Sequence, residues 1–359
     1  MDSDFLIIGG GIAGVSAAAR IAPLGRVILV EAEAHLATQS SARSAALYEA
    51  TYGPPVVREL NRASFADYQA SGTLSPRGFM LIGAVGGDET FARECADFEL
   101  TEMPLDQARA MVPILNPATV ARAAFSPDAW DIDTHALIQM FLRQARAEGA
   151  QVITRAPVSA IRRLPQGWAV TAGGDQITAR VIVNAAGAWA DQIAQMAGIA
   201  PIGLQPYRRS MARIPAPGGH DLSGWPMLVG PGDTFYFKPD AGALLVSPCE
   251  ADPMPPHDAF PDDMVLAEGL ARYEHYMSEP VTRLIASWAG LRSFAPDHNL
   301  VLGPDATDDA FVWVAGQGGY GFQTCPAASQ LVADRIAGRT SALPAPVVAA
   351  LDPARFSRH

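Results

Sequence analysis

Three glycines near the N-terminus have the spacing G-x-G-x-x-G, which suits the binding of a diphosphate. Gly9, Gly11 and Gly14 follow the apolar run FLII and open an alanine-rich segment. The first glycine of such a motif permits a tight turn, the second lets the backbone approach a pyrophosphate, and the third lets a helix pack close to a strand. The helix that begins here, with Ile12 and Ala13 in its first turn, offers amide donors and its positive dipole end. The motif therefore predicts a dinucleotide site.

An acidic residue lies where such a site needs an acceptor for a ribose hydroxyl. The apolar run from Val27 to Val30 predicts a second strand, which ends at Glu31 and Ala32. An acid rather than an arginine at this position favours an unphosphorylated ribose, and so FAD or NAD over NADP. The glycine spacing does not by itself separate FAD from NAD.

The elements that position these residues recur at the start, the middle and the end of the chain. VIVNAAGAWAD predicts a buried strand that runs into a glycine turn and a helix, and AFVWVAGQGGYGFQT repeats that order near the C-terminus. Between them, Asp133 caps a predicted helix over 134–148 that ends at Gly149. We also predict a helix over 54–72, a strand over 76–85 and a hairpin turn at 239–242.

This order predicts an α/β fold with two intertwined domains. A Rossmann-like, nucleotide-binding domain is expected to contain an inserted α+β substrate domain. We assign residues 1–75, 150–203 and 288–359 to the first domain, and residues 76–149 and 204–287 to the second.

The composition limits the classes of function. The 359 residues carry a formal net charge of -11, which argues against nucleic acid as a partner. The 3 cysteines form no C-x-x-C pair and no group at metal-ligand spacing, so we expect no metal and a reducing, cytoplasmic location. Asp2 and Asp4 stand where a signal peptide carries positive charge, and no run is long enough to span a bilayer. Weak attachment to a membrane surface stays open.

Several further motifs carry a family resemblance. They are ARSAALYEATYG, DIDTHAL, VIVNAAGAWAD, LQPYRRS, FYFKPDAGALLVSP, WAGLRSFAPD and GQGGYGFQT. Over nearly its full length the chain resembles the D-amino-acid oxidase and glycine oxidase superfamily of FAD-dependent enzymes, and within it most resembles the bacterial D-arginine dehydrogenases. The resemblance implies non-covalent FAD, a substrate domain with a mixed sheet over the flavin, and oxidative deamination of a D-amino acid by hydride transfer to flavin N5.

The resemblance also implies which residues meet the substrate. Arg292 would anchor its carboxylate through a bidentate guanidinium, unless it forms an interdomain salt bridge instead. Arg209 would be a second substrate-facing arginine, with the roles of Arg208 and Arg209 open to exchange. Tyr52 and Tyr236 would be active-site tyrosines, each giving a directed hydrogen bond on an apolar ring.

More positions would contact the cofactor. A helix after Gly321 would direct its N-terminus at the flavin's pyrimidine carbonyl and stabilise the anionic reduced flavin. Arg292 and Gly319 would lie beside both flavin and substrate. The remaining expected contacts are Ser41, Arg43, Ser44, Ala45, Ala46, Val158, Ala186, Gly187, Trp189, Gly318, Tyr320, Gln323 and Thr324. Tyr48, close to Tyr52 in the sequence, is expected to pack in the core.

Two departures from the D-arginine dehydrogenase pattern bear on the substrate. This chain has Leu47 where that enzyme has a histidine, and Phe79 lies near the position of its acidic residue. A cationic side chain buried against these two apolar residues would be left unpaired. We therefore expect an apolar or neutral D-amino acid, or a cyclic imino acid, rather than D-Arg or D-Lys.

The electron acceptor and the reaction class leave alternatives open. The loop SPCEADP carries no lysine that could activate oxygen, and Lys238 is the chain's one lysine. This favours a dehydrogenase that passes electrons to a quinone or another acceptor, with oxidase activity open. A 2-hydroxy-acid dehydrogenase would use the same carboxylate anchor, and a non-catalytic flavoprotein subunit is a third alternative. The scattered histidines form no general-base pattern.

Overall fold

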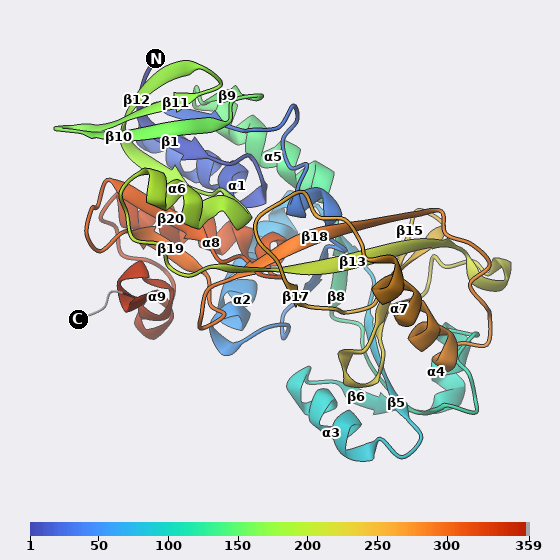
Figure 1. Cartoon of the computed structure of the whole chain (residues 1–359). Coiled ribbons are helices and arrows are strands. Elements are labelled where there is room, and N and C mark those ends of the chain that lie inside the picture. Colours follow the sequence, from blue (N-terminus) through green and yellow to red (C-terminus); the bar gives the residue numbers. More distant parts are fainter. Residues whose placement is uncertain (357–359) are drawn as a thin grey trace.

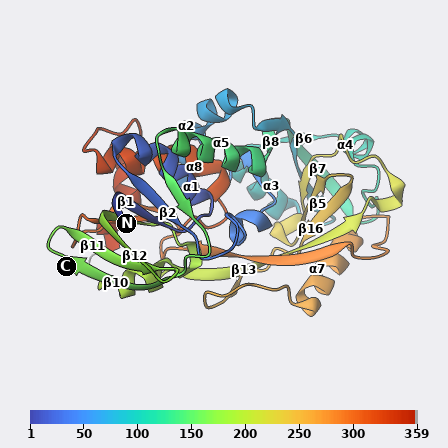
Figure 2. The ribbon, with the colours of Figure 1, turned by 90° about the horizontal axis from the view of Figure 1, so that it is seen from above.

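A computed structural model describes residues 1–356, and it contains two large sheets (Figure 1). Each sheet combines segments that are far apart in the sequence, as the mixture of colours in each half shows (Figure 1). Seen from above, the molecule is elongated, and strand β13 (Gln205–Pro215) runs from one half to the other (Figure 2). The predicted α/β class is confirmed.

The first sheet has eight strands within the described residues. They are β1 (Asp2–Ile8), β2 (Val27–Val30), β9 (Gln151–Ile153), β10 (Val158–Leu164), β11 (Gly167–Ala172), β12 (Asp175–Asn184), β19 (Val301–Pro304) and β20 (Phe311–Ala315). β1 pairs in parallel with β2 and β12, and β12 pairs in parallel with β20. This parallel core joins the start, middle and end of the chain, as the recurring motifs predict.

Helices cover both faces of the first sheet. Phe5 and Ile7 pack with α1 (Ile12–Ile21), α5 (Thr134–Ala147) and α8 (Gly321–Ile336). Leu6 and Ile8 point the other way and pack with α6 (Ala190–Met196). Because successive side chains of a strand alternate between faces, burial on both faces requires the continuous apolar runs of β1 and β2. Outside this layer, α2 (Pro55–Ser71) packs on α8 and on α9 (Ala345–Leu351).

The second sheet has nine strands in the part of the chain that the structure describes. In addition to β13 they are β5 (Phe79–Ala84), β6 (Thr101–Met103), β7 (Val120–Ser126), β14 (Met227–Val229), β15 (Tyr236–Asp240), β16 (Ala243–Ser247), β17 (Asp252–Pro253) and β18 (Ala286–Phe294). β14 pairs in parallel with β5, whereas β13 pairs antiparallel with β16 and β18, so the sheet is mixed. The helices of this half are α3 (Asp88–Asp97), α4 (Leu105–Met111) and α7 (Asp263–Tyr276).

The predicted local features around these strands are confirmed. Asp133 caps α5 by accepting a hydrogen bond from Ala136 N at 2.8 Å. The β15–β16 hairpin turns at Ala241 and Gly242, which have φ of 45° and 74°. Positive φ at both central residues is the geometry of a type I′ hairpin turn, which matches the twist of the strands.

A small third sheet lies between the two halves and carries Tyr48. Its strands are β3 (Leu47–Glu49), β4 (Leu74–Pro76) and β8 (Ala129–Ile132). Tyr48 is 1% exposed, and its hydroxyl donates to the Asn61 carbonyl at 2.8 Å. Tyr48 is thus a core residue, as expected.

The buried ion cluster beside this sheet involves the chain's one lysine. Lys238 Nζ lies 2.9 Å from one carboxylate oxygen of Asp131, and Arg77 Nε donates to the other at 2.7 Å. Asp131 lies opposite Leu47 in the β3–β8 pair. The cluster therefore connects β15 to the small sheet. Both oxygens of Asp131, the carboxylate nearest to Leu47 in that strand pair, already have a cationic partner.

The packing of two segments differs from the domain boundaries that we predicted from the sequence. Helix α5, assigned to the substrate domain, packs on α1 in the first layer. Strand β18, assigned largely to the nucleotide-binding domain, pairs with β13 along its whole length, from Ala286 to Phe294. We propose boundaries that move both segments accordingly. Among the described residues, no helix is long and apolar enough to cross a membrane.

Candidate active site

A cavity of about 440 Å³ runs from the glycine motif to the β13–β18 pair. Many of the residues predicted to hold cofactor or substrate line it. They are Gly9, Gly11, Ile12, Ala13, Glu31, Ala32, Ser41, Arg43, Ser44, Ala45, Val158, Ala186, Gly187, Trp189, Arg209, Tyr236, Arg292, Gly318, Gly319 and Gly321. The sequence thus predicted much of one continuous wall from segments far apart in the chain.

The glycine motif has the geometry that a diphosphate needs. Gly9 has φ of 109°, and a Cβ there would lie 2.4 Å from the Ala185 carbonyl oxygen. A Cβ on Gly14 would lie 1.9 Å from the Gly9 carbonyl oxygen, so only glycine lets α1 pack this close to β1. Gly14 itself does not line the cavity, since it faces the strand. A Cβ on Gly11 would meet only the Ser41 hydroxyl, at 3.2 Å, and would otherwise project into open space.

The first turn of α1 and the end of β2 present fixed polar groups. Gly11, the N-cap of α1, provides no side-chain cap, and Ile12 N donates to Ser41 Oγ at 3.0 Å. The Glu31 carboxylate accepts from Gly10 N at 2.6 Å and from Glu33 N at 2.8 Å. Glu31 is therefore held rigidly at the cavity wall, where a ribose hydroxyl would find an acceptor.

Helix α8 begins at the other end of the cavity. Its N-cap, Tyr320, makes no side-chain capping hydrogen bond, and no acidic residue lies in its first turn. Gly321 and Phe322, at the start of α8, line the cavity. An uncapped helix start directs unpaired N–H groups and positive potential at this space, which suits the electron-rich edge of a flavin.

Arg209 and Arg292 face this end of the cavity from neighbouring strands. Arg209 lies opposite Gly290 and Arg292 opposite Tyr207, so the two arginines share one face of the β13–β18 pair. Neither forms an ion pair among residues 1–356, and Arg209 Nε has no hydrogen-bond partner there. Arg208 points to the opposite face and donates to Asp252 at 2.6 Å. Of the two neighbours, Arg209 therefore faces the cavity, and Arg208 forms the ion pair outside it.

The charge of Arg292 is maintained by its surroundings. Burial opposes the charged form, but Tyr52, Tyr236, Cys249 and Asp233 together raise the pKa of the guanidinium. Burial also raises the pKa of Tyr236, against the opposing influence of the two arginines. Both groups therefore present hydrogen-bond donors to the cavity at neutral pH.

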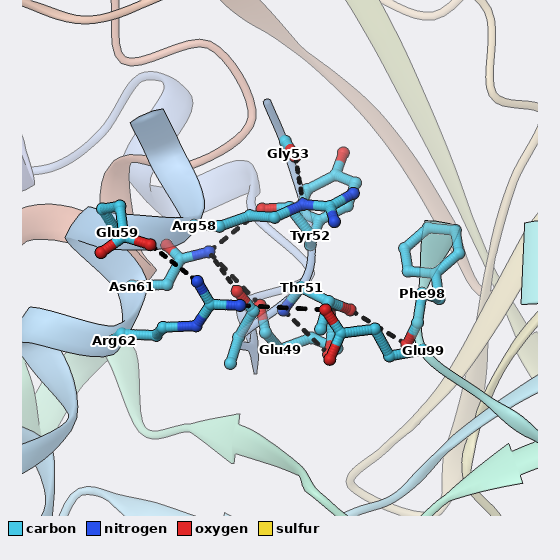
Figure 3. Close-up of polar contacts among 11 residues, drawn as sticks. Glu49, Thr51, Tyr52, Gly53, Arg58, Glu59, Asn61, Arg62, Phe98 and Glu99 are labelled. Carbon is cyan, nitrogen blue, oxygen red and sulfur yellow. Dashed lines mark hydrogen bonds and ion pairs between the residues drawn. The ribbon is translucent and has the colours of Figure 1, made fainter. Parts of the chain in front are cut away.

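Tyr52 approaches the same point from the first half of the molecule, at Gly319, although neither Tyr52 nor Tyr320 lines the cavity itself. A Cβ on Gly319 would lie 3.2 Å from Arg292 Nη1 and 3.3 Å from Tyr52 Oη, so both polar groups converge on this glycine. The Tyr52 ring is stacked on Phe98, with centroids 6.4 Å apart, and meets Tyr320 edge-on at 5.3 Å. Figure 3 shows Tyr52 beside Phe98, next to a network of polar groups that extends from the buried Asn61 to exposed ion pairs of Arg62. The absence of a side chain at Gly319 leaves a space next to a guanidinium and a phenol.

Some predicted residues lie elsewhere. Leu47 and Phe79 pack in the apolar cluster around Tyr236, with Phe79 against Phe98 at 5.0 Å between centroids, so they lie behind the cavity wall. Ala46 has φ of 49° and lies next to the lining residue Ala45. These residues shape the wall without lining it.

Three predicted cofactor contacts serve other roles in this structure. The guanidinium of Arg43 donates to the carbonyls of Ala289, at 2.8 Å, and Ala259, at 3.1 Å, and pairs with Asp258. It therefore joins the cavity wall to β18. The side chains of Gln323 and Thr324 are buried and bond to the backbone of the Tyr52 turn and of Tyr320.

The sequence missed Gly290, which lines the cavity, and Asp233, which does not line it but interacts with Arg292. Gly290 leaves room for the segment Ser40–Arg43, since a Cβ there would lie 3.2 Å from Arg43 Cβ. Asp233 accepts a hydrogen bond from the Cys249 thiol at 3.3 Å and contributes to the raised pKa of Arg292. Gly290 could have been found from its place two residues before Arg292. Asp233 had no such signal, because its loop reaches the site only through sheet pairing.

A model of the FAD-dependent oxidoreductase family, DAO, matches residues 4–335. The chain belongs to this family. Its FAD-dependence is thereby established, and the lining fits the cofactor: the first turn of α1 with Ser41 would hold the diphosphate, Glu31 the ribose, and the start of α8 the flavin. Within residues 1–356, no group of His, Cys, Asp or Glu could hold a metal ion.

Relatives of this FAD-dependent oxidoreductase share its overall form. The chain is 24% identical to FAD-dependent oxidoreductase domain-containing protein 1 of Bos taurus, over 93% of this chain and 81% of that one. L-proline dehydrogenase from P. horikoshii matches with a TM-score of 0.83 and 22% identity, over 99% of this chain and 98% of that one. Glycine oxidase from Geobacillus kaustophilus matches with a TM-score of 0.83 and 21% identity, over 100% and 99%. The superfamily is thus confirmed, and the resemblance to D-arginine dehydrogenases stays a prediction from the sequence.

Proposed function

We propose that the protein oxidises the amine of a D-amino acid with an apolar or neutral side chain. The product would be an imino acid that hydrolyses to a 2-keto acid. The observation that carries this proposal is a pair of arginines, Arg209 and Arg292, that line the cavity and form no ion pair among the described residues. Arg292 also converges with Tyr52 at Gly319. Both arginines are half-buried, and a guanidinium that is partly removed from water is favoured by an anionic partner, so this arrangement supports an anionic ligand at this point.

The chain's own residues would bind and orient the substrate. Arg292 would hold the carboxylate bidentately, and Arg209, Tyr52 and Tyr236 would complete its hydrogen bonds. Bound FAD accepts a hydride. A carboxylate anchored at one end of the cavity fixes where the α-hydrogen points, and such orientation is a large part of the rate enhancement.

The two arginines also favour the reactive form of the substrate. Loss of a hydride from the α-carbon requires a neutral amine. Nearby positive charge disfavours an ammonium group and lowers its pKa. Proximity to Arg209 and Arg292 would therefore help to deprotonate the bound amine without a dedicated histidine base.

The apolar surroundings support a neutral substrate side chain. Leu47 and Phe79 lie behind the wall and pack in one apolar cluster with the lining residue Tyr236. Asp131, opposite Leu47, is already paired with Lys238 and Arg77. Asp233 already accepts a hydrogen bond from the Cys249 thiol and interacts with the charge of Arg292. A cationic side chain directed towards Leu47 and Phe79 would therefore lose its hydration without gaining a partner.

The surroundings of Lys238 bear on which molecule accepts the electrons. We propose a quinone or another carrier rather than oxygen, because Lys238, the chain's one lysine, is 6% exposed and bonded to Asp131. Peroxide formed in amounts equal to the imino acid, in air-saturated buffer without dye, would contradict this part of the proposal.

The experiment for the function is anaerobic bleaching of the bound flavin by matched substrates. D-Leu, D-Met, D-Phe and D-Pro should bleach it, each faster than D-Arg and faster than its L-enantiomer. The 2-hydroxy acids of the same side chains test the alternative reaction class. Faster bleaching by the hydroxy acids would show that the substrate is a 2-hydroxy acid rather than an amino acid. Bleaching by none of these compounds would favour a non-catalytic flavoprotein subunit.

A further inference from the structure

The turn that carries Tyr52 connects β3 to α2 and places several backbone carbonyls in the interior. It runs from Glu49 to Gly53, and Glu49 is 7% exposed. A buried carbonyl without a hydrogen bond costs free energy, so such a turn needs internal donors. Figure 3 shows that polar side chains from outside the turn supply them.

Asn61 of α2 is the main donor. Its Nδ2 donates to the carbonyls of Tyr52 at 3.0 Å, Ala50 at 3.3 Å and Glu49 at 3.4 Å (Figure 3). Asn61 is fully buried, and its Oδ1 has no partner among the described residues. In the opposite amide orientation an oxygen would face three oxygens. The side chain therefore serves to hold this turn.

Gln323 holds the same turn from α8. Its Nε2 donates to the Tyr52 carbonyl at 3.3 Å, and its Oε1 accepts from Glu49 N, also at 3.3 Å. Gln323 is 2% exposed and does not line the cavity. One amide thus connects both ends of the turn to the helix whose start lines the cavity.

The Tyr52 ring has little freedom once this backbone is fixed. Phe98 stacks on one side of it and Tyr320 meets it edge-on. Tyr52 N donates to the Glu49 carbonyl at 3.2 Å, and Arg58 Nε donates to the Gly53 carbonyl at 2.8 Å. With the backbone and ring both held, the hydroxyl is fixed beside Gly319 and Arg292.

We propose that Asn61 and Gln323 are positioning residues, which hold the Tyr52 hydroxyl at the substrate carboxylate without reaching the cavity themselves. The inference rests on the proposed role of Tyr52 as a carboxylate contact. It reassigns Gln323 from a cofactor contact to a support of the substrate site. It also predicts that the effect of either residue on ligand binding passes through the phenol of Tyr52.

A double-mutant cycle in the FAD-loaded enzyme tests this. The readouts are the Kd of benzoate, followed by the flavin absorbance spectrum, and kcat and KM for D-Leu. Tyr52→Phe should weaken benzoate by roughly tenfold, the range for one lost hydrogen bond to a charged group. Asn61→Leu should weaken it similarly, and the double variant Asn61→Leu/Tyr52→Phe should be no weaker than Tyr52→Phe alone. Gln323→Met, which removes both the donor and the acceptor, should behave like Asn61→Leu.

A matched control separates positioning from general stability. Tyr48→Phe removes a buried hydrogen bond to the Asn61 carbonyl but none to the Tyr52 turn. It should lower Tm and leave the Kd of benzoate within about twofold. If Asn61→Leu does not fold, Gln323→Met carries the cycle with Tyr52→Phe.

Three results would overturn the inference. The first is full additivity of the two changes, and the second is a Kd unaffected by both Asn61→Leu and Gln323→Met. The third is a Kd unaffected by Tyr52→Phe, since the phenol would then make no contact for these residues to position. Benzoate binding does not depend on turnover. An enzyme that binds benzoate through this network but oxidises no amino acid would retain the inference and lose the proposed function.

Discussion

Arg209 and Arg292 lie one diagonal step apart on the same face of the β13–β18 pair, and neither has a carboxylate partner among residues 1–356. Both arginines line the cavity, so this end of it presents positive charge, which suits the anionic ligand that we propose. Because the strands β13 and β18 are paired along nine positions, from Gln205 with Phe294 to Arg213 with Ala286, the backbone spacing of the two arginines is fixed by the sheet.

The first prediction concerns Arg292. Arg292→Lys keeps the charge but loses the planar fork that binds a carboxylate bidentately. We expect kcat/KM for D-Leu to fall by roughly 100-fold, within the range for a truncated buried charge pair. Arg208→Lys is the matched control, because Arg208 pairs with Asp252 outside the cavity. An equal loss in both variants would mean that the effect is structural.

The second prediction concerns Gly319. Gly319→Ala would place a methyl group 3.2 Å from Arg292 Nη1 and 3.3 Å from Tyr52 Oη, in the space assigned to the carboxylate. Flavin content and Tm should stay close to those of the natural protein, while KM rises by about tenfold or more. Gly224→Ala, with no atom within 4 Å of the added methyl, is the control. An unchanged KM would remove the carboxylate from this position.

The third prediction concerns cofactor affinity. Glu31→Gln leaves one oxygen acceptor for the amides of Gly10 and Glu33, and its new NH₂ group would face the other amide. The Kd of FAD should rise by roughly tenfold, measured by fluorescence after removal and titration of the flavin. Glu59→Gln, which loses an exposed ion pair with Arg62, should leave the Kd unchanged.

The fourth prediction concerns pH. Burial raises the pKa of Glu49, although the hydrogen bonds from Thr51 and the charge of Arg58 oppose the shift. The folded protein thus binds this proton more tightly than the unfolded chain, so stability falls as pH rises above the ordinary value of 4.5. Glu49→Gln removes this dependence. We therefore expect the difference in free energy of unfolding, variant minus natural protein, to increase from pH 4 upward. A difference that decreases would show that the neighbours of Glu49 stabilise its charged carboxylate instead.

The sequence predicted the local parts of this structure well. The glycine motif, β2, the capped helix α5 and the hairpin turn depend on contacts within a few residues, and each was found at its predicted place. Arg209 and Arg292 were found because a family resemblance marked them. Their shared face and lack of partners could not be read from the sequence, because both depend on the pairing of strands about 80 residues apart.

The sequence also misplaced residues for identifiable physical reasons. Gln323 follows a glycine loop at the cofactor, but its side chain points away from the cavity and into the Tyr52 turn. The family resemblance predicts that Leu47 and Phe79 lie near the substrate, but in the structure they pack behind the cavity wall. β18 begins a segment otherwise assigned to the first domain, but its backbone hydrogen bonds go to β13.

The most direct test of the central claim compares D-leucine with D-leucinamide in anaerobic stopped-flow reduction of the bound flavin. The two molecules share the amine, the α-hydrogen and the side chain, and differ in the carboxylate that Arg209, Arg292 and Tyr52 are proposed to hold. We predict that D-leucine reduces the flavin at least about 100-fold more efficiently, as the reduction rate divided by the half-saturating concentration. Equal efficiency for the two compounds, or no reduction by D-leucine, would contradict the account.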